Sequence, residues 1–122
     1  MPMVSRERYL PGRKTEALMK RTFKSEKDVK EVVKQLLKAV PDCWWFMPPA
    51  NGLGRSGIPD FIGHVHGRFF GIETKFGKGK TTANQDREIM LIGQAGAPVW
   101  IVNETNLREF ATQFAHWVES CY

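Results

Sequence analysis

The sequence predicts an α/β domain in which a mixed central sheet is flanked by helices. Three observations predict this class: segments with apolar residues every three or four positions, a pair of short apolar runs around a tight-turn signal, and further strand-length apolar runs between the helical segments. In chain order the elements read helix, strand, strand, strand, helix, strand, helix. With 122 residues, of which 42% are hydrophobic and 25% charged, the chain has the size and composition of one globular domain.

Positive charge is concentrated at the start of the chain, in residues 1–24, before a domain expected over residues 25–122. This basic N-terminal arm holds seven basic residues and two acidic ones, a net charge of +5 that equals the charge of the whole chain. A basic arm on a neutral body is typical of a protein that binds a polyanion such as DNA, although a solubilising arm or a structural helix explains it too. A weak helical pattern lies around residues 16–23. The residues of the arm expected to contact phosphate are Arg13, Lys14 and Arg21.

The first strong helix is predicted after Ser25, which is placed as its N-cap, and is stopped by Pro41. Apolar residues recur at spacings of three and four from Val29 to Val40, which gives one buried stripe. Glu26 falls on that stripe, three residues before Val29, so its carboxylate is expected to point inward. A first-turn Glu also interacts favourably with the helix dipole, which is the alternative explanation. The outer side of the helix is assigned to Lys27, Lys30, Glu31, Lys34 and Lys38.

A buried strand is predicted over Cys43–Met47 and ends at Pro48-Pro49. The segment Ala50–Gly57 then reads as a loop, whose glycines let the backbone approach a ligand closely. Arg55 in this loop is a candidate for a phosphate contact, with a plain connector as the equal alternative.

Two runs rich in Phe, Ile and Val lie on either side of the dipeptide His66-Gly67. Glycine at the second position of a two-residue turn tolerates a positive φ, so the dipeptide predicts a β-hairpin. If the turn is centred there, paired residues have a constant sum of sequence numbers. Val65 then pairs with Arg68, and the same rule continues along both strands to their far ends.

At those far ends the pairing places Asp60 directly opposite Glu73, with Cβ atoms about 5 Å apart, where like charges destabilise a sheet. A fold keeps such a pair when a positive charge lies between the carboxylates, and a divalent metal with hard oxygen ligands is the simplest candidate. Lys75 lies two residues after Glu73, so strand alternation puts its ammonium on the same face. The alternative is a solvated hairpin face, but three charged groups in register across one turn favour a site.

The segment Phe76–Thr82 after the hairpin contains Gly-Lys-Gly-Lys-Thr and superficially resembles a phosphate-binding P-loop. That motif needs a glycine five residues before the glycine of Gly-Lys-Thr. The position is Thr74, so no nucleotide cofactor is expected. The loop is basic and follows the predicted site directly. Its candidates for contacts with a DNA backbone are Lys78 and Lys80.

A second helix is predicted over Thr82–Gln94, with its first residue as the cap. Gln85 shares a face with the apolar residues of this helix, so it is expected to point inward toward the hairpin, unless it is simply a buried Gln satisfied by backbone. The continuous apolar run Pro98–Val102 is predicted as a strand buried on both faces. A last amphipathic helix follows a cap at Asn103–Thr105.

The chain holds two cysteines, Cys43 and Cys121, and no apolar run of transmembrane length. Its first residues carry charges but no hydrophobic segment of a secretion signal. Reduced thiols in a cytoplasm are therefore expected, that of a bacterium or of the host cell if the protein is phage-encoded. Neither a zinc site made by the cysteines alone nor a membrane partner is expected.

Three groups of residues together resemble the PD-(D/E)XK nuclease pattern: Gly57–Asp60, Glu73–Lys75 and Gln85. Within that superfamily the sequence is most similar to the VRR-NUC branch, the virus-type replication-repair nucleases, in their stand-alone phage and bacterial form. The resemblance covers residues 25–102, and its motifs are specific in combination and weak singly. It implies a restriction-endonuclease-like core with the element order αβββαβ.

The resemblance also implies a set of metal ligands around Mg²⁺ or Mn²⁺. Asp60 and Glu73 are the first-choice ligands. In the family a Glu on the first helix joins the metal site, and Glu26 matches that place. The carbonyl oxygen of Thr74 is implied as a further ligand.

Two residues are expected to act on the attacking water. Lys75 would orient or activate it and offset the negative charge that develops on the phosphate. In the family a Gln assists the active site, and Gln85 matches its position. Together with Asp60 and Glu73 they form the expected catalytic set.

These expectations predict a metal-dependent, structure-selective DNA endonuclease, similar to a Holliday-junction resolvase. The chain shows no sequence-reading module, so its contacts would fall on phosphate and groove shape. Symmetric cleavage of a four-way junction needs two sites, which a twofold homodimer supplies, and the many aromatic residues leave material for an apolar interface. The alternatives are a nuclease for flaps or splayed arms, a DNA-binding module without catalysis, and a metal-dependent hydrolase of a small phosphate ester.

Overall fold

The computed structural model describes residues 10–49, 52 and 54–122. Its elements run helix, helix, three strands, helix, strand, helix, and the four strands form one mixed sheet. The expected α/β class with helices beside the sheet is therefore confirmed. No helix in these described ranges is both long and apolar enough to cross a membrane. The elements are α1 (Arg13–Lys20), α2 (Glu26–Lys38), β1 (Cys43–Phe46), β2 (Phe61–Val65), β3 (Arg68–Thr74), α3 (Ala83–Gln94), β4 (Val99–Val102) and α4 (Leu107–Ser120).

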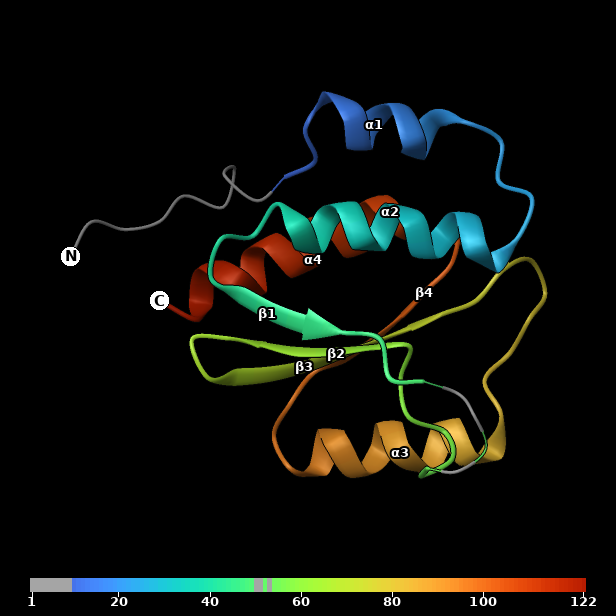
Figure 1. The fold of residues 1–122 in the computed structure, drawn as a ribbon, viewed down its shortest axis with the longest axis vertical. Coiled ribbons are helices and arrows are strands. Elements are labelled where there is room, and N and C mark those ends of the chain that lie inside the picture. Colours follow the sequence, from blue (N-terminus) through green and yellow to red (C-terminus); the bar gives the residue numbers. More distant parts are fainter. Residues whose placement is uncertain (1–9, 50–51, 53) are drawn as a thin grey trace.

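The sheet has the order β1-β2-β3-β4, in which β1, β2 and β3 are antiparallel neighbours and β4 runs parallel to β3. A parallel pair needs a crossover connection, which α3 supplies between β3 and β4. Figure 1 shows α2 and α4 on one face of the sheet and α3 on the other, with α1 outside α2. The sheet is thus the middle layer of the molecule, and helices cover both of its faces.

The central hairpin turns at His66-Gly67, as the dipeptide predicts. Both residues have a positive φ, 49° and 78°, as a type I′ turn requires. Val65 pairs with Arg68, and the constant-sum register continues to the first residue of β2. The far ends of the two strands therefore lie side by side in the predicted alignment.

The main core lies between the sheet and the helices α2 and α4. Phe70, in β3, is fully buried and meets Phe114 and Trp117 of α4 edge-on, at ring-centroid distances of 5.3 and 5.6 Å. Edge-to-face aromatic contacts add to the stabilisation that burial provides. The amphipathic assignment of α2 is confirmed by its buried stripe. This stripe consists of Val29, Val32, Val33, Leu36 and Leu37.

Both outer strands are more exposed than expected from the sequence. β1, predicted as a buried strand, exposes Trp44 to 58% and Phe46 to 39%. The run Pro98–Val102, predicted to be buried on both faces, becomes β4, in which Ile101 is 44% exposed. Both predictions were wrong because these strands are the two edges of the sheet, and α3 leaves part of its face uncovered.

The described part of the basic arm packs on the body of the protein. α1 begins three residues before the predicted helical pattern, and its residues Thr15 and Met19 are buried. Arg108 of α4 donates from Nη1 to both carboxylate oxygens of Glu16, at 3.0 and 2.9 Å. The arm from residue 10 onward therefore contributes to the fold, while residues 1–9 lie outside the described ranges.

Candidate active site

The predicted site residues meet where β3 ends and the chain leaves the sheet. Asp60 directly precedes β2, and Glu73 and Thr74 are the last residues of β3. Lys30 of α2 and Gln85 of α3 reach these residues from opposite faces of the sheet. All three layers of the molecule therefore contribute side chains to this place.

Thr74 fixes the carboxylate of Asp60. Asp60 Oδ2 accepts hydrogen bonds from the backbone N–H of Thr74 at 2.9 Å and from Thr74 Oγ1 at 2.5 Å. Thr74 is fully buried, so the surrounding core holds both donors in place. The other oxygen, Oδ1, lies 3.8 Å from Lys30 Nζ. The motif implies a role only for the carbonyl oxygen of Thr74, and the role of its side chain was missed because it depends on a contact between two strands.

Gln85 holds the carboxylate of Glu73. Its Nε2 donates to Glu73 Oε2 at 3.0 Å, so the side chain points inward as predicted. Its Oε1 accepts from the backbone N–H of Thr82 at 2.9 Å, while the N–H of Gln85 donates to Thr82 Oγ1 at 3.2 Å. These two bonds form a capping box at the start of α3, with Thr82 as the predicted N-cap. One amide group therefore both caps the helix and aligns the buried acid.

The two central carboxyl groups are coupled to each other. Burial, the hydrogen bond with Asp60 and the charge of Asp60 raise the pKa of Glu73 from 4.5 to about 8, although the charge of Lys75 opposes this. Burial alone would raise the pKa of Asp60 as well, but its hydrogen bonds and then the charge of Lys30 lower it below its ordinary value. Near neutral pH the pair therefore holds one proton, on Glu73.

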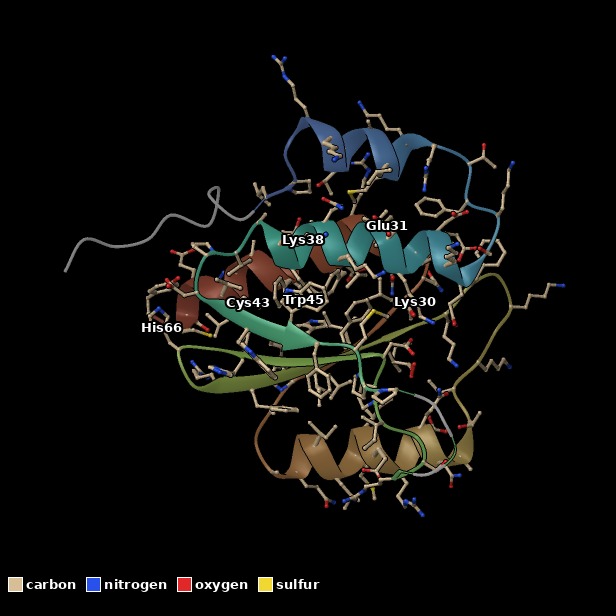
Figure 2. The ribbon with its side chains drawn as sticks, in the orientation of Figure 1. Lys30, Glu31, Lys38, Cys43, Trp45 and His66 are labelled. Atoms are coloured by element: carbon tan, nitrogen blue, oxygen red, sulfur yellow. The ribbon has the colours of Figure 1, made fainter. Side chains whose placement is uncertain are left out.

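Lys30 enters the site from α2, although the periodicity predicts it on the outer side of that helix. Its side chain is 27% exposed, and Nζ lies 3.1 Å from Glu26 Oε2. Burial by itself would lower the pKa of this ammonium, but the bond to Glu26 and the charges of Asp60, Glu26 and Glu73 raise it. Figure 2 shows Lys30 on the side of α2 that faces the sheet. The placement of Lys30 on the outer side was wrong because residues 26 and 30 lie one turn apart on the same face of the helix. A helix that directs Glu26 toward the site therefore directs Lys30 toward it as well.

Two of the three carboxylates predicted as metal ligands, those of Asp60 and Glu73, are placed so that they suit a divalent cation. Asp60 and Glu73 present the hard oxygen donors that Mg²⁺ or Mn²⁺ takes in proteins. Glu26 instead pairs with Lys30, and its side chain is 39% exposed. Within the described ranges, no three His, Cys, Asp or Glu side chains are placed so as to hold one ion together. Two donors therefore fit a metal directly, and Glu26 fits only after the ammonium beside it moves.

Lys75 follows β3 directly, half-buried. Its backbone N–H donates to the carbonyl oxygen of Val102 at 2.8 Å, so the pairing of β3 with β4 continues to this residue. The charge of its side chain lowers the pKa of Glu73 against the other influences. This effect agrees with the predicted placement of Lys75 and Glu73 on one face.

Gly57 lets the loop before Asp60 pack closely against the backbone at the start of α3. Its φ is 85°, and a Cβ added there would lie 2.4 Å from the backbone oxygen of Asn84. Any side chain at this position would be strained and would collide with backbone. The glycine of the Gly57–Asp60 motif is thus required by the close approach of two backbone segments.

The predicted DNA contacts lie on three separate segments of the chain, and all of them are exposed. Lys78 and Lys80 are exposed on the loop after β3, whose Gly77 N–H donates to both carboxylate oxygens of Glu104 at 3.0 Å. Arg55 donates from Nε to Glu88 of α3 at 2.7 Å, yet 63% of its side chain is exposed. The predicted contacts Arg13, Lys14 and Arg21 are exposed on α1 and at its C-cap, and Lys20 is a further exposed basic residue of this helix.

The raised pKa of Glu73 predicts how the metal-free protein responds to pH. The folded protein keeps this proton up to about pH 8, whereas an unfolded Glu releases it near pH 4.5. The contribution of Glu73 to stability is therefore full below pH 4.5 and is lost as the pH rises through about 8. Asp60 has a lowered pKa, so its contribution is lost in the opposite direction, as the pH falls.

In EDTA, the urea concentration at the unfolding midpoint of the wild type is therefore expected to decrease as the pH is raised from about 5 to about 8.5. Glu73→Gln cannot ionise, so its midpoint should fall less over the same range. Glu109→Gln, on the exposed side of α4, makes the same Glu-to-Gln substitution without touching the site and should behave as the wild type. An equal fall in all three proteins would show that Glu73 does not titrate in this range.

Comparison of the chain with protein-family models, with curated proteins and with solved structures gives no match. The resemblance to VRR-NUC nucleases is therefore carried only by the residues at the motif positions and by the order of the predicted elements around them.

Proposed function

We propose that this protein is a metal-dependent endonuclease that hydrolyses phosphodiester bonds in branched DNA. The observation that carries this function is the pairing of the half-buried Asp60 with the buried Glu73, whose carboxyl groups Thr74 and Gln85 hold in place. A buried carboxyl group such as Glu73, whose pKa is raised to about 8, costs stability, and such groups cluster at functional sites. Asp60, Glu73 and the neighbouring Lys75 together form the arrangement that metal-assisted hydrolysis requires.

Each residue of the site has a definite task in this chemistry. When bound, Mg²⁺ or Mn²⁺ supplies a water of lowered pKa and polarises the phosphate. Asp60, through Oδ1, and Glu73 would hold the ion. Binding would release the proton that the two acids share, because a metal ligand has to be deprotonated. Thr74 and Gln85 fix these two carboxylates and thereby the position of the ion. Lys75 orients the attacking water and offsets the negative charge that develops on the phosphate.

DNA is the proposed substrate because exposed cations lie on several segments, two of which adjoin the site in the chain. The loop with Lys78 and Lys80 follows the site in the chain, and Arg55 lies on the loop before it. The exposed basic residues of α1 extend the positive charge further. Contacts of this kind fall on phosphate and carry no sequence information. Selectivity for a DNA structure, such as a four-way junction, follows more readily from them than selectivity for a sequence.

A homodimer is proposed because one edge of the sheet is apolar and is left uncovered by the residues that the structure describes. Trp44 and Phe46 are exposed on the edge strand β1, and Phe69 of β3 is 40% exposed on the same face. An edge strand without charges or proline tends to pair with another chain. A second copy joined edge to edge across a twofold axis would cover these side chains and provide the two sites that symmetric cuts need.

Trp44→Glu is expected to convert the dimer into a monomer, because it places a charge in the proposed apolar interface. Light scattering should give twice the chain mass of 14.0 kDa for the wild type and a single chain mass for the variant. Met90→Glu is the matched control, because it adds the same charge at an exposed apolar residue of α3. A wild-type protein that is monomeric at working concentration would refute the proposed dimer but not the proposed nuclease function.

One assay separates the proposed function from its alternatives. The wild type is incubated with plasmid DNA, an immobile four-way junction and a single-stranded flap, in Mn²⁺ or in EDTA. Symmetric cuts in the junction that require Mn²⁺ support the proposal, whereas cutting of the flap alone would indicate a flap nuclease. Binding without cutting would indicate a DNA-binding module, and hydrolysis of a small phosphate ester alone would indicate a small-substrate hydrolase.

A further inference from the structure

We propose that Lys30 is an internal counter-ion that a divalent metal has to displace before Glu26 can join the site. Because the same carboxylates are involved, this role depends on the metal-assisted function proposed above. Lys30 is then a positioning residue: it sets the metal affinity of the site without touching the substrate.

Lys30 Nζ lies close to two of the acids expected to bind a metal, Glu26 and Asp60. It lies 3.1 Å from Glu26 Oε2 and 3.8 Å from Asp60 Oδ1. Asp60 Oδ2 accepts two hydrogen bonds from Thr74, so Oδ1 is the oxygen of this carboxylate that suits a cation. The ammonium therefore occupies the side of Asp60 on which a metal would bind.

Electrostatics explain why an ammonium is present at this place. The negative charges of Glu26 and Asp60 act on Lys30, and that of Glu73 adds to them once this acid loses its proton. Carboxylates that lie this close repel one another, and leaving them uncompensated beside the core costs free energy. A lysine suits this task because it carries a compact charge at the end of a flexible stem.

The same charge opposes a divalent ion. Lys30 Nζ lies 3.8 Å from Asp60 Oδ1, so a metal held by this oxygen would be near the ammonium, and like charges repel at the dielectric of a protein surface. The side chain of Lys30 is partly exposed, so its stem can carry Nζ into solvent. Glu26 Oε2 then loses its partner and can turn to the metal. The exchange removes one ammonium from the site and adds a third carboxylate to it.

The helix α2 offers a matched control for this exchange. Lys38 lies in the last turn of the same helix, is exposed, and stands at the opposite end of α2 from Lys30 in Figure 2. Lys38→Met removes the same charge and the same type of side chain as Lys30→Met. A difference between the two variants therefore reports on the position of the lysine and not on the net charge of the protein.

The first test measures Mn²⁺ binding by calorimetry in the absence of DNA. Lys30→Met is expected to bind Mn²⁺ about tenfold more tightly than the wild type, and Lys38→Met to bind it as the wild type does. Mn²⁺ should accordingly raise the melting temperature of Lys30→Met more than that of the wild type. Equal or weaker binding by Lys30→Met would overturn the exchange, because a lysine that merely orients Glu26 for the metal has that effect.

The second test uses the wild-type chain and remains decisive if Lys30→Met does not fold. Acetic anhydride acetylates exposed amines, and mass spectrometry reads the rate at each lysine with and without Mn²⁺. Displacement predicts faster acetylation of Lys30 in Mn²⁺ and an unchanged rate at Lys38, and an unchanged or slower rate at Lys30 refutes it. Neither test involves cleavage, so a protein that exchanges Lys30 for Mn²⁺ and cuts no DNA would refute the nuclease function alone.

Discussion

Glu73→Gln is expected to reduce DNA cleavage by roughly a thousandfold or more while leaving the protein folded and able to bind DNA. The amide has the shape of the protonated acid that the site holds near neutral pH, so it can still accept the hydrogen bond from Gln85. It cannot give up a proton in exchange for a metal, and one ligand is lost. Cleavage of a labelled junction in Mn²⁺ measures the activity, and a gel shift in EDTA measures binding.

The other members of the site allow the same experiment. Asp60→Asn and Lys75→Met are expected to lose cleavage to a similar extent, the first through the metal and the second through the attacking water. Glu109→Gln removes one carboxylate from the exposed side of α4 and should cleave as the wild type does. Wild-type turnover by both the Glu73 and the Lys75 variants would contradict the assignment of this site.

The largest expected effect on stability lies at Phe70 of β3. Phe70→Ala should lower the free energy of unfolding by about 3–5 kcal/mol. The ring is fully buried, and the substitution removes its contacts with Phe114 and Trp117 of α4. Urea denaturation, followed by circular dichroism, measures the loss.

Phe69→Ala is the matched control, because the preceding residue of the same strand points to the opposite face and is 40% exposed. Its cost in a monomer should be clearly smaller than that of Phe70→Ala, since part of the ring already meets solvent. Equal losses for Phe69→Ala and Phe70→Ala would mean that the core is not concentrated on the side of α2 and α4. The pair thus tests the two faces of the sheet within one strand.

The hairpin and its alignment were predictable because the information is local. A dipeptide that tolerates positive φ fixes the turn, and the turn fixes the register of every pair after it. The start of α3 was predictable for the same reason, since Thr82 and Gln85 are three residues apart and cap one another. The inward direction of Gln85 follows from helix periodicity once the start of the helix is known.

Most of the errors concern contacts between elements that are distant in the chain. An apolar strand at the edge of a sheet and one in its centre have the same sequence signature, so Trp44 and Ile101 were placed in the core. The assignment of Lys30 failed differently, because a charged residue was assumed to face solvent even though it shares a helix face with Glu26. The anchoring of Asp60 by the side chain of Thr74 needs the strands to be aligned, which no local pattern specifies.

The convergence of three layers on one site has a consequence for incompletely folded chains. Lys30 comes from α2, Gln85 from α3, and the two acids from the sheet and its border. Local unfolding that releases either helix removes a charge or a hydrogen bond from the carboxylates, so the site is assembled only when both helices are docked. A nascent or partly opened chain therefore has no complete centre for the proposed hydrolysis. The fold would therefore confine the proposed hydrolysis to the fully folded protein.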